Sequence, residues 1–401
     1  MTVEKYIEEN WNPCVRETKE DDGTLIGLPY PYIVPSPAEK FQEMYYWDTF
    51  FTCKGLILSG RAEIAKNCCD NMAYLIEKYG FIPNGSRTYY LNRSQPPYFS
   101  MMVRDVYEIY RDKEWLEDIY NTLKKEYEFW MTKRMTSIGL NRYGVDMSKV
   151  KDLNRYSCER IGITPKGRTR EDIAECILSD CESGWDFNPR TCMHQTQFVY
   201  LDLNCNLYMY EKNFVYFAEI LGNGEQEEWE KKAEKRCELI NKYLWAGECY
   251  LDYNFKTNSF SKIFSVASFY PMWAGIATEE QAEKTVQMLD KLEYDFGVVA
   301  CEKNDVPGTY QWNYPNGWAP LHYIVVRALD QYGYKTESKR IAEKYVNIVD
   351  ANFEKTGTLW EKYNVVTGDL NVSNEYEMPI MLGWTAGVYL YMKDYLNHEI
   401  K

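Results

Sequence analysis

Apolar residues recur at helical spacing in long segments that come in pairs, and this recurrence constrains the fold more than any other feature of the chain. In the segment 61–80, the apolar positions that share one face of a predicted helix are Ile64, Cys68, Met72 and Leu75. A second apolar helix is predicted within residues 41–60 and ends at Gly60. Because only this glycine joins them, we predict an antiparallel helical hairpin.

Similar segments follow along the rest of the chain. Helical pairs are predicted at residues 98–112 with 114–134, 194–222 with 225–245, and 319–334 with 336–357, and further helices at 278–293 and 379–399. Strand patterns are few and short, as at residues 248–255. Long helices with short connections predict an all-α fold of stacked helical pairs.

The chain shows no Pro/Ser-rich linker that would divide it, so we predict a single domain over residues 41–401. Four prolines within residues 27–40 prevent a regular helix there, and we expect residues 1–40 to form an extended arm packed on that domain. Residues 144–172 are irregular and are interpreted as an excursion within the domain.

Charge and cysteine content exclude several classes of partner. Sixty acidic and 46 basic residues give a net charge of -14, which repels a phosphate backbone, so we expect no nucleic acid. We expect no membrane span, because no run of eighteen apolar residues occurs. The chain begins without a secretory signal pattern, and its twelve cysteines form no CxxC pair, so we predict a cytoplasmic protein with reduced thiols.

The aromatic content is high, with 36 Tyr and 12 Trp. Aromatic faces with polar edges are surfaces on which sugar rings stack, although most of these residues must fill helix interfaces. Trp130 and Trp245 lie on helical patterns and are expected in the core. The three histidines, His194, His322 and His398, are too far apart for a local metal site, so we predict no metal.

Asp186 lies between Trp185 and Phe187 in the segment 181–190. Apolar neighbours raise the pKa of a carboxyl group such as Asp186, which suits a general acid. A helix N-cap is the alternative interpretation, because Asn188 and Pro189 precede an apolar-periodic run. The local sequence leaves both interpretations open.

A glycosidic bond is broken most often by two carboxylates, one protonated and one ionised. Several carboxylates lie outside predicted helix faces: Glu43, Asp48, Glu171, Asp186, Glu361, Glu375 and Glu377. Composition does not choose among them.

Six segments, in this order, resemble the motif series of the trehalases of glycoside hydrolase family 37: residues 41–51, 80–98, 182–187, 311–320, 360–365 and 375–388. The resemblance spans residues 38–388. It implies an (α/α)6 toroid of six inner and six outer helices, whose loops close a deep pocket at one end. It also implies hydrolysis of the α,α-1,1 bond of trehalose with inversion at the anomeric carbon, with no metal or organic cofactor.

The resemblance assigns the catalytic pair residue by residue. The aspartate of the family's SGWDF motif corresponds to Asp186, which would be the general acid. The glutamate nine residues before the tryptophan of the family's GWT motif corresponds to Glu375, because Trp384 keeps that interval. Glu375 would then be the base that deprotonates water, with Glu377 as its local competitor.

Substrate-binding positions follow from the same motifs. Phe41, Tyr45 and Trp47 would offer rings to a sugar face, and Asp48 would accept hydrogen bonds from hydroxyls. The innermost glucose would be held by Asn84, Arg93 and Gln95, although Arg93 alone would be read as a surface cation and Asn84 as a turn residue. Other matched segments contain Trp312, Asn316, Trp318, Trp360 and Glu361. The resemblance also relates Arg170 and Glu171 to a separate Arg/Glu segment of the family, although the spacing to Asp186 is shorter here.

The chain departs from the family pattern at several positions. Lys40 stands where the family has a pocket arginine, Asn313 replaces an aspartate, and residues 369–374 replace a glycine run. The longer middle segment common in the family is absent. These departures motivate one alternative, an inverting hydrolase of another small α-glucoside. A second alternative is a sugar-binding protein without catalysis, which the presence of both Asp186 and Glu375 weakens. A third is a purely structural toroid, which does not explain the loop motifs.

The expected partner is therefore a small disaccharide, bound without nucleic acid, membrane or cofactor. A monomer suffices for this chemistry, and the sequence contains no signal for an oligomer. In the inverting mechanism, Asp186 protonates the bridging oxygen while Glu375 takes a proton from water, so we expect the two carboxyl groups roughly 6.5 to 9.5 Å apart.

Overall fold

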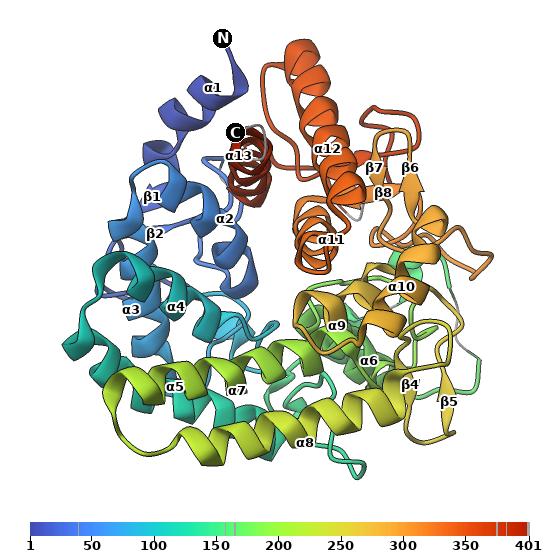
Figure 1. The fold of residues 1–401 in the computed structure, drawn as a ribbon, viewed down its shortest axis with the longest axis horizontal. Helices are drawn as coiled ribbons and strands as arrows, with labels where there is room; N and C mark the ends of the chain where they lie inside the picture. Colours follow the sequence, from blue (N-terminus) through green and yellow to red (C-terminus); the bar gives the residue numbers. More distant parts are fainter. Residues whose placement is uncertain (39, 157, 164–165, 374–375, 382, 399–401) are drawn as a thin grey trace.

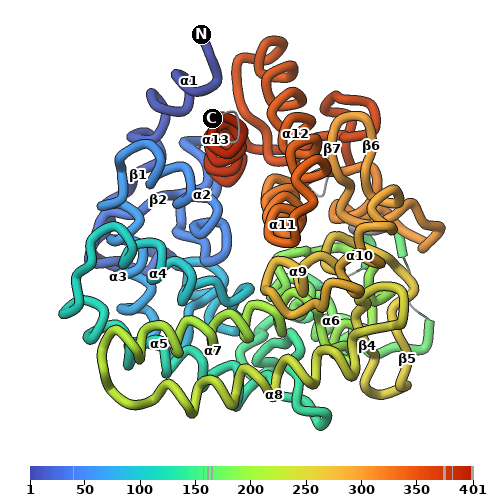
Figure 2. Tube along the Cα trace, viewed as in Figure 1, coloured from blue at the N-terminus to red at the C-terminus, as the bar shows by residue number. Residues whose placement is uncertain are grey.

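The computed structural model of the chain describes residues 1–38, 40–156, 158–163, 166–373, 376–381 and 383–398 (Figure 1). Helices dominate the structure and are arranged around a common centre, as the tube of Figure 2 also shows. None of the helices in these ranges is long and apolar enough to cross a membrane.

Six helices form an inner ring: α2 (Tyr46–Leu58), α4 (Phe99–Tyr110), α7 (Leu201–Leu221), α9 (Tyr270–Trp273), α11 (Ala319–Gln331) and α13 (Gly383–His398). Each helix contacts the next in this order, and α13 packs against α2. The ring is thereby closed, and the predicted (α/α)6 toroid is confirmed.

A second set of helices lies outside the ring: α1 (Val3–Asn10), α3 (Ala62–Tyr79), α5 (Lys113–Lys133), α8 (Gln226–Leu244), α10 (Glu279–Gln287) and α12 (Lys335–Thr356). The pattern of buried residues differs between the inner helix α2 and the outer helix α3. Helix α2 buries residues along most of its length, whereas α3 buries one face only and exposes charged residues on the other. A helix covered on most sides, such as α2, needs no polar face, whereas a helix covered on one side, such as α3, is amphipathic.

The connections carry short strands and single turns of 3-10 helix. The strands pair antiparallel as β1 (Val15–Arg16) with β2 (Tyr32–Ile33), β3 (Phe198–Val199) with β4 (Tyr253–Asn254) and β5 (Ser259–Phe260), β6 (Glu293–Tyr294) with β7 (Gly297–Val298), and β8 (Asn316–Trp318) with β9 (Lys362–Asn364). The 3-10 turns are Asn12–Cys14, Thr88–Tyr90, Met147–Lys149, Leu153–Arg155, Cys158–Ile161, Gln195–Gln197, Val266–Phe269 and Leu289–Lys291.

The pairing of β8 with β9 positions the later motifs. In its register Trp318 lies opposite Lys362, so the segment 311–320 lies beside the segment 360–365. Two motifs more than forty residues apart in sequence therefore meet at one end of the toroid.

Three helices were not predicted from the sequence. Helix α1 lies within the expected N-terminal arm, which is therefore not extended throughout. Helix α6 (Arg170–Glu182) begins inside the segment interpreted as irregular, and α9 is only four residues long. The division into an arm and a single domain stays a prediction.

The N-cap interpretation of Asp186 is wrong. No helix begins directly after Arg190, because residues 191–200 form a turn, the 3-10 turn Gln195–Gln197 and strand β3, and α7 begins only at Leu201. As expected, Trp130 is fully buried, while Trp245 is half-buried and packs on Tyr250 with ring centroids 4.8 Å apart.

Candidate active site

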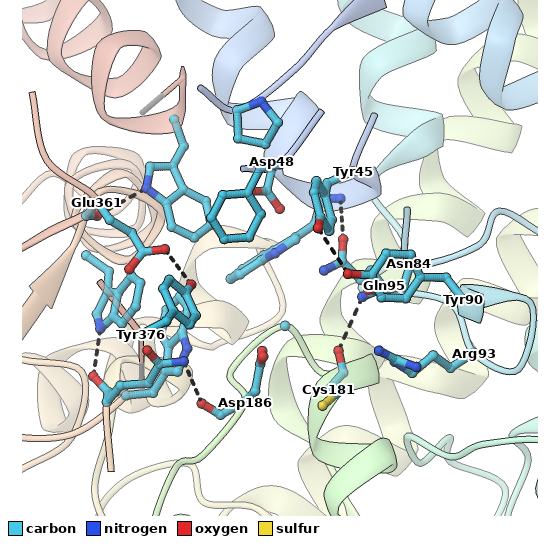
Figure 3. Close-up of a pocket in the computed structure, with 18 residues that line it drawn as sticks. Tyr45, Asp48, Asn84, Tyr90, Arg93, Gln95, Cys181, Asp186, Glu361 and Tyr376 are labelled. Atoms are coloured by element: carbon cyan, nitrogen blue, oxygen red, sulfur yellow. Dashed lines mark hydrogen bonds between the residues drawn. The ribbon is translucent and has the colours of Figure 1, made fainter. Parts of the chain in front are cut away.

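A cavity of about 180 Å³ opens among the loops at one end of the toroid (Figure 3). Its walls are contributed by all of the matched motifs. The lining residues are Pro35, Phe41, Tyr45, Trp47, Asp48, Asn84, Tyr90, Arg93, Gln95, Cys181, Gly184, Asp186, Gln311, Trp312, Trp318, Glu361, Tyr376 and Trp384.

Five tryptophans in mutual contact form the apolar part of the cavity and its support. Trp312 stacks on Trp318 with ring centroids 3.8 Å apart and planes 4° apart, and Trp185 stacks on Trp312 at 5.4 Å. Trp47 and Trp384 meet at 5.8 Å, and each also contacts Trp312. Rings held in this way keep a fixed orientation, which suits a surface for a sugar ring.

Asp186 lies in the loop that follows α6 and points its carboxyl group toward the cavity (Figure 3). The chain turns sharply on both sides of it. Gly184 has a φ of 73°, and a Cβ at this position would lie 2.7 Å from the Trp47 ring. Phe187 has a φ of 63°, which is unusual for a residue with a side chain. The loop therefore needs support from its surroundings.

Glu182, at the end of α6, supplies part of that support. Its buried carboxylate accepts hydrogen bonds from Arg134 Nε at 2.7 Å and Arg134 Nη2 at 2.8 Å. The backbone N–H groups of Ser94 and Gly144 donate to the same carboxylate at 2.8 and 2.6 Å. One carboxylate thus connects the loop before Asp186 with α5 and with the wall that carries Arg93.

Arg190 supports the other end of the loop. Its buried guanidinium donates to Asp202 at 2.7 Å and to Asp252 at 2.8 Å. It also lies over the Trp185 ring, 4.5 Å from the centroid. This contact fixes Trp185, the residue directly before Asp186.

A second carboxylate, Glu361, reaches the cavity from the residue before β9. Its Oε2 forms an ion pair with Lys362 Nζ at 2.6 Å, and its Oε1 accepts a hydrogen bond from the Tyr376 hydroxyl at 2.6 Å. Lys362 is fully buried, and its ammonium lies 4.5 Å from the centroid of the Trp318 ring. Both oxygens of Glu361 are therefore held in place.

Asp48, in the first turn of α2, is the third described carboxylate of the cavity. Burial, and to a smaller extent the nearby Glu361 charge, raise the pKa of Asp48 from its ordinary value of 3.8 to about 8. At neutral pH this group is therefore largely protonated in the empty cavity.

The opposite wall is polar. Asn84 Nδ2 donates to the Cys181 carbonyl at 3.5 Å, and Gln95 Oε1 accepts from the Trp47 N–H at 3.2 Å. Arg93 is 8% exposed, and its Nη1 donates to Asn92 at 2.9 Å. These contacts fix three side chains that retain donors for the hydroxyls of a sugar.

The mouth of the cavity is aromatic. The Tyr45 hydroxyl donates to Glu43 Oε1 at 2.7 Å and lies 3.0 Å from the Tyr90 hydroxyl. The Phe41 ring contacts Tyr45 at 5.8 Å and Tyr376 at 5.6 Å. Aromatic rings therefore surround the entrance between α2 and the loop that carries Asp186.

A metal ion has no ready site here. Among the residues that the structure describes, no group of three or more His, Cys, Asp or Glu side chains could hold one.

Comparison with protein families decides the identity of the scaffold. A family profile described as Trehalase matches residues 2–397. The chain belongs to the trehalase family. A periplasmic trehalase of Xanthomonas oryzae pv. oryzae is 32% identical over 424 aligned positions, which cover 97% of this chain and 72% of the relative.

Solved structures agree with this membership. Neutral trehalase Nth1 from Saccharomyces cerevisiae superposes with a TM-score of 0.81 at 26% identity, over 100% of this chain and 80% of the yeast chain. A GH63 mannosylglycerate hydrolase from Thermus thermophilus, solved with glucose, shares the fold with a TM-score of 0.67 at 14% identity, over 98% of this chain and 100% of that chain. Membership in the trehalase family makes this chain a glycoside hydrolase, and the sequence-based expectation of trehalose hydrolysis is confirmed at the level of the family.

The structure brings most of the predicted site residues of this trehalase-family chain into one cavity. Those that line it are Phe41, Tyr45, Trp47, Asp48, Asn84, Arg93, Gln95, Asp186, Trp312, Trp318 and Glu361. Their roles stay predictions, because placement alone does not test a role.

Other predicted residues lie outside the cavity lining. Lys40 is exposed and lies 3.9 Å from Glu377, and Arg170 and Glu171 are exposed in the first turn of α6. The Trp360 indole donates outward to Thr356 at 3.0 Å. These side chains do not line the described cavity, and their roles in binding stay predictions.

Asn316 has a supporting position. Its buried amide donates to the carbonyls of Gln311 and Ser373, both at 2.8 Å, and accepts from the Ser373 N–H at 3.2 Å. It therefore connects the segment 311–320 with the segment that leads to Glu375. Glu375 itself, the predicted base, lies outside the described residues.

Sequence reasoning missed several lining residues: Pro35, Tyr90, Cys181, Gly184, Gln311, Tyr376 and Trp384. Most of them lie inside the matched motifs, as Tyr90 and Gln311 do, so the motifs themselves were the available signal. Pro35 and Cys181 carry no signal of this kind.

Proposed function

We propose that the chain hydrolyses trehalose with inversion, and that Asp186 is the general acid. The observation that carries this proposal is that Asp186 and a second carboxylate, Glu361, line one narrow cavity from different loops (Figure 3). Two carboxylates on different walls are what a single displacement at an anomeric carbon requires.

The general base is assigned from the described geometry. The sequence assigned this role to Glu375, for which the structure gives no placement. Glu361 lines the cavity as an ion-paired carboxylate, and its two oxygens are oriented by Lys362 and Tyr376. We therefore propose Glu361 as the base and retain Glu375 as the alternative that a variant can test.

The proposed reaction is one step. Asp186 gives its proton to the bridging oxygen of trehalose, and that C–O bond breaks as a water oxygen bonds to the anomeric carbon. Glu361 takes the proton that the water loses. The products are two glucose molecules, of which the attacked one is released as the β-anomer. The proton then passes from Glu361 through solvent to Asp186, which restores the starting state.

Substrate placement follows from the two sides of the cavity. Asn84, Arg93 and Gln95 supply donors to the hydroxyls of the innermost glucose, and Asp48 exchanges hydrogen bonds with them. Trp312 and Trp318 contribute apolar surface to the same cavity. A ring held between these groups presents its anomeric carbon to the two catalytic carboxylates.

Proton NMR of the first products tests the proposal. Trehalose should give α- and β-glucose in equal initial amounts, before mutarotation. The variants Asp186→Asn and Glu361→Gln should each lose activity by about 10³-fold or more, and Glu375→Gln should retain a larger share. Pure α-glucose as the initial product would refute inversion, and a stronger loss in Glu375→Gln than in Glu361→Gln would return the base to Glu375. Maltose, kojibiose and nigerose serve as comparison substrates.

We also propose a cytoplasmic location and a monomer. Each of the twelve cysteines is a free thiol, as in proteins of reducing compartments, and a single chain supplies the whole described cavity lining. The negative charge of -14 supports a function without nucleic acid. Cell fractionation and light scattering after size-exclusion chromatography test these two proposals, and a periplasmic fraction or a stable dimer would contradict them.

A further inference from the structure

Asp180, in the last turn of α6, holds the loop that carries Asp186. It is 1% exposed, and its Oδ2 accepts the Phe187 N–H at 2.7 Å and the Asn188 N–H at 3.4 Å. Its Oδ1 accepts Asn188 Nδ2 at 2.7 Å. One buried carboxylate thus receives three N–H groups from the two residues that follow Asp186.

Asn188 extends this contact to the residue on the other side of Asp186. Its Nδ2 donates to the Trp185 carbonyl at 2.8 Å as well as to Asp180. The backbone before and after Asp186 is therefore tied to one point on α6. We call Asp180 and Asn188 the acid-loop clamp.

The loop needs this clamp because its conformation is unfavourable for the chain alone. Phe187 adopts a left-handed conformation, which is unfavourable for a residue with a side chain. The turn of the loop places Trp185 in the main hydrophobic core and Phe187 in a separate cluster with Cys158 and Ile177. Asp186 is left at the tip between the two, where its direction depends on the loop.

We propose that Asp180, through the acid-loop clamp, is a positioning residue that keeps the Asp186 carboxyl aimed at the bridging oxygen of the substrate. This inference rests on the proposed function, since it takes Asp186 as the general acid. Asp180 does not line the cavity and does not touch the substrate. Its effect reaches the reaction only through Asp186.

The surroundings of Asp180 make the clamp sensitive to pH. Burial raises the pKa of Asp180 from 3.8 to about 7, against the opposing effects of the Phe187 and Asn188 N–H groups. The ionisable and polar groups that face it are Arg190, whose charge lowers the pKa, and Gln195, Tyr200, Cys301 and Tyr310. Protonation places a hydrogen on a carboxyl group whose contacts are all N–H donors, so the clamp weakens below about pH 7.

Substitution by asparagine imitates the protonated clamp. In Asp180→Asn one acceptor becomes an NH2 group, which must face either the Phe187 N–H or Asn188 Nδ2. We expect kcat for trehalose to fall about 10- to 100-fold at pH 8.5, with KM changed by less than about threefold. The ratio of wild-type to variant kcat should shrink toward pH 5.5, where the wild-type clamp is protonated as well.

Two variants control this measurement. Asn188→Ala removes the other half of the clamp. In the double variant, the increase in activation free energy should be smaller than the sum of the increases in the two single variants. Glu211→Gln alters a carboxylate of similar burial that pairs with Arg236, away from the cavity. It should lower Tm without a pH-dependent change in kcat.

The substrate α-glucosyl fluoride distinguishes a wrongly oriented general acid from a general loss of structure, because fluoride leaves with little help from a proton. Asp180→Asn should hydrolyse this substrate within about threefold of the wild type while losing trehalose hydrolysis. A kcat ratio that stays constant with pH, or equal losses on both substrates, would overturn the clamp. Retention of full trehalose activity in Asp186→Asn would instead overturn the proposed function, so the two failures are distinguishable.

Discussion

The pKa of Asp48 depends on residues that other motifs bring into the cavity. Asp48 lies on α2, and its pKa is raised to about 8 by burial and by the charge of Glu361. Glu361 is more than three hundred residues away in sequence. The protonation of Asp48 thus depends on a carboxylate from a distant segment. A sugar hydroxyl that donates to Asp48 would favour its ionised form.

Asp48→Asn should weaken the transition-state complex, because a hydrogen bond to a charged group contributes about 1.5–3 kcal/mol. We expect kcat/KM for trehalose to fall roughly 10- to 100-fold above pH 8, and the ratio to wild type to grow between pH 6 and 9 as Asp48 ionises. Steady-state kinetics at six pH values measures this.

Asp330→Asn is the matched control, because Asp330 pairs with Lys335 outside the cavity lining. Its kcat/KM should match the wild type at each pH. A ratio for Asp48→Asn that does not change with pH would remove Asp48 from substrate binding in its ionised form.

At the scale of elements, buried polar contacts join helices of the inner and outer sets. Glu126 on α5 accepts the Tyr46 hydroxyl of α2 at 2.6 Å and also the Tyr210 hydroxyl of α7. Burial raises the pKa of Glu126 from 4.5 to about 7, against the opposing effect of these two hydroxyls. One carboxyl group therefore links three helices beneath the cavity.

The raised pKa of Glu126 gives stability a definite pH dependence. A group whose pKa is higher in the folded state stabilises it fully below the unfolded-state pKa, and this contribution is lost as pH rises through the folded-state value. Between about pH 4.5 and 7 the loss should reach about 3 kcal/mol. Urea unfolding at pH 5 and 8 should show a smaller decrease in Glu126→Gln than in the wild type, and equal decreases would contradict the assignment.

The contact of α2 with α13 closes the inner ring and depends on two glycines. A Cβ on Gly387 would lie 2.2 Å from the Phe51 carbonyl oxygen, and one on Gly55 would lie 2.6 Å from Gly387 Cα. Neither neighbour is a flexible side chain, so the helices must move apart to admit a methyl group.

Gly387→Ala should therefore reduce the free energy of unfolding by about 1–3 kcal/mol. It should also reduce activity, because α2 carries Trp47 and Asp48. Urea unfolding and kcat measure the two effects. Lys393→Ala, on the exposed side of α13, should change stability by less than about 0.5 kcal/mol. A stable and fully active Gly387→Ala would contradict the tight approach of these helices.

At the scale of the whole molecule, α1 and α13 lie near each other where the ring closes (Figure 1), and Lys393 of α13 pairs with Glu4 of α1 at 3.2 Å. Tyr6 of α1 packs on Phe353 of α12 with ring centroids 5.1 Å apart, and the Trp11 indole donates to Ser59, after α2, at 3.1 Å. Helix α1 and its C-cap residue Trp11 thus connect the outer helix α12 with the end of the inner helix α2.

Deletion of residues 1–13 should lower Tm by about 5 to 10 °C, because it removes the buried Val3, Ile7 and Trp11 from the core. Differential scanning fluorimetry measures this change. Glu4→Gln, which alters a partly exposed ion pair with Lys393 and a long hydrogen bond from the Tyr389 hydroxyl at 3.5 Å, should leave Tm within about 1 °C. An unchanged Tm after deletion would mean that α1 does not contribute to closure.

Much of the fold could be predicted because helical periodicity is local. The pairs α2 with α3 and α4 with α5 were expected within a few residues of their ends. Helix α6 was missed because its buried residues include Ser179, Asp180 and Glu182, so it lacks a clear apolar face. Helix α9 is too short to show a period.

The site was predictable only where a motif carried it. Motifs named Trp47, Asp48, Asp186 and Glu361, and these residues do line one cavity. The family resemblance also named Arg170, from a segment outside those motifs. Arg170 is exposed, because the neighbours of a residue along the chain do not determine which way its side chain points. Asn316 likewise proved to hold a loop.

The sequence by itself determined the helical period, the family and the chemical types of side chain available for the reaction, because each of these depends on residues close together in the chain. Tertiary structure alone decided which carboxylates share the cavity, how Lys362 pairs with Glu361, and how Asp180 supports the loop of Asp186. The burial, charge pairing and orientation of these side chains depend on groups brought together from distant segments. They exist only after the toroid has closed.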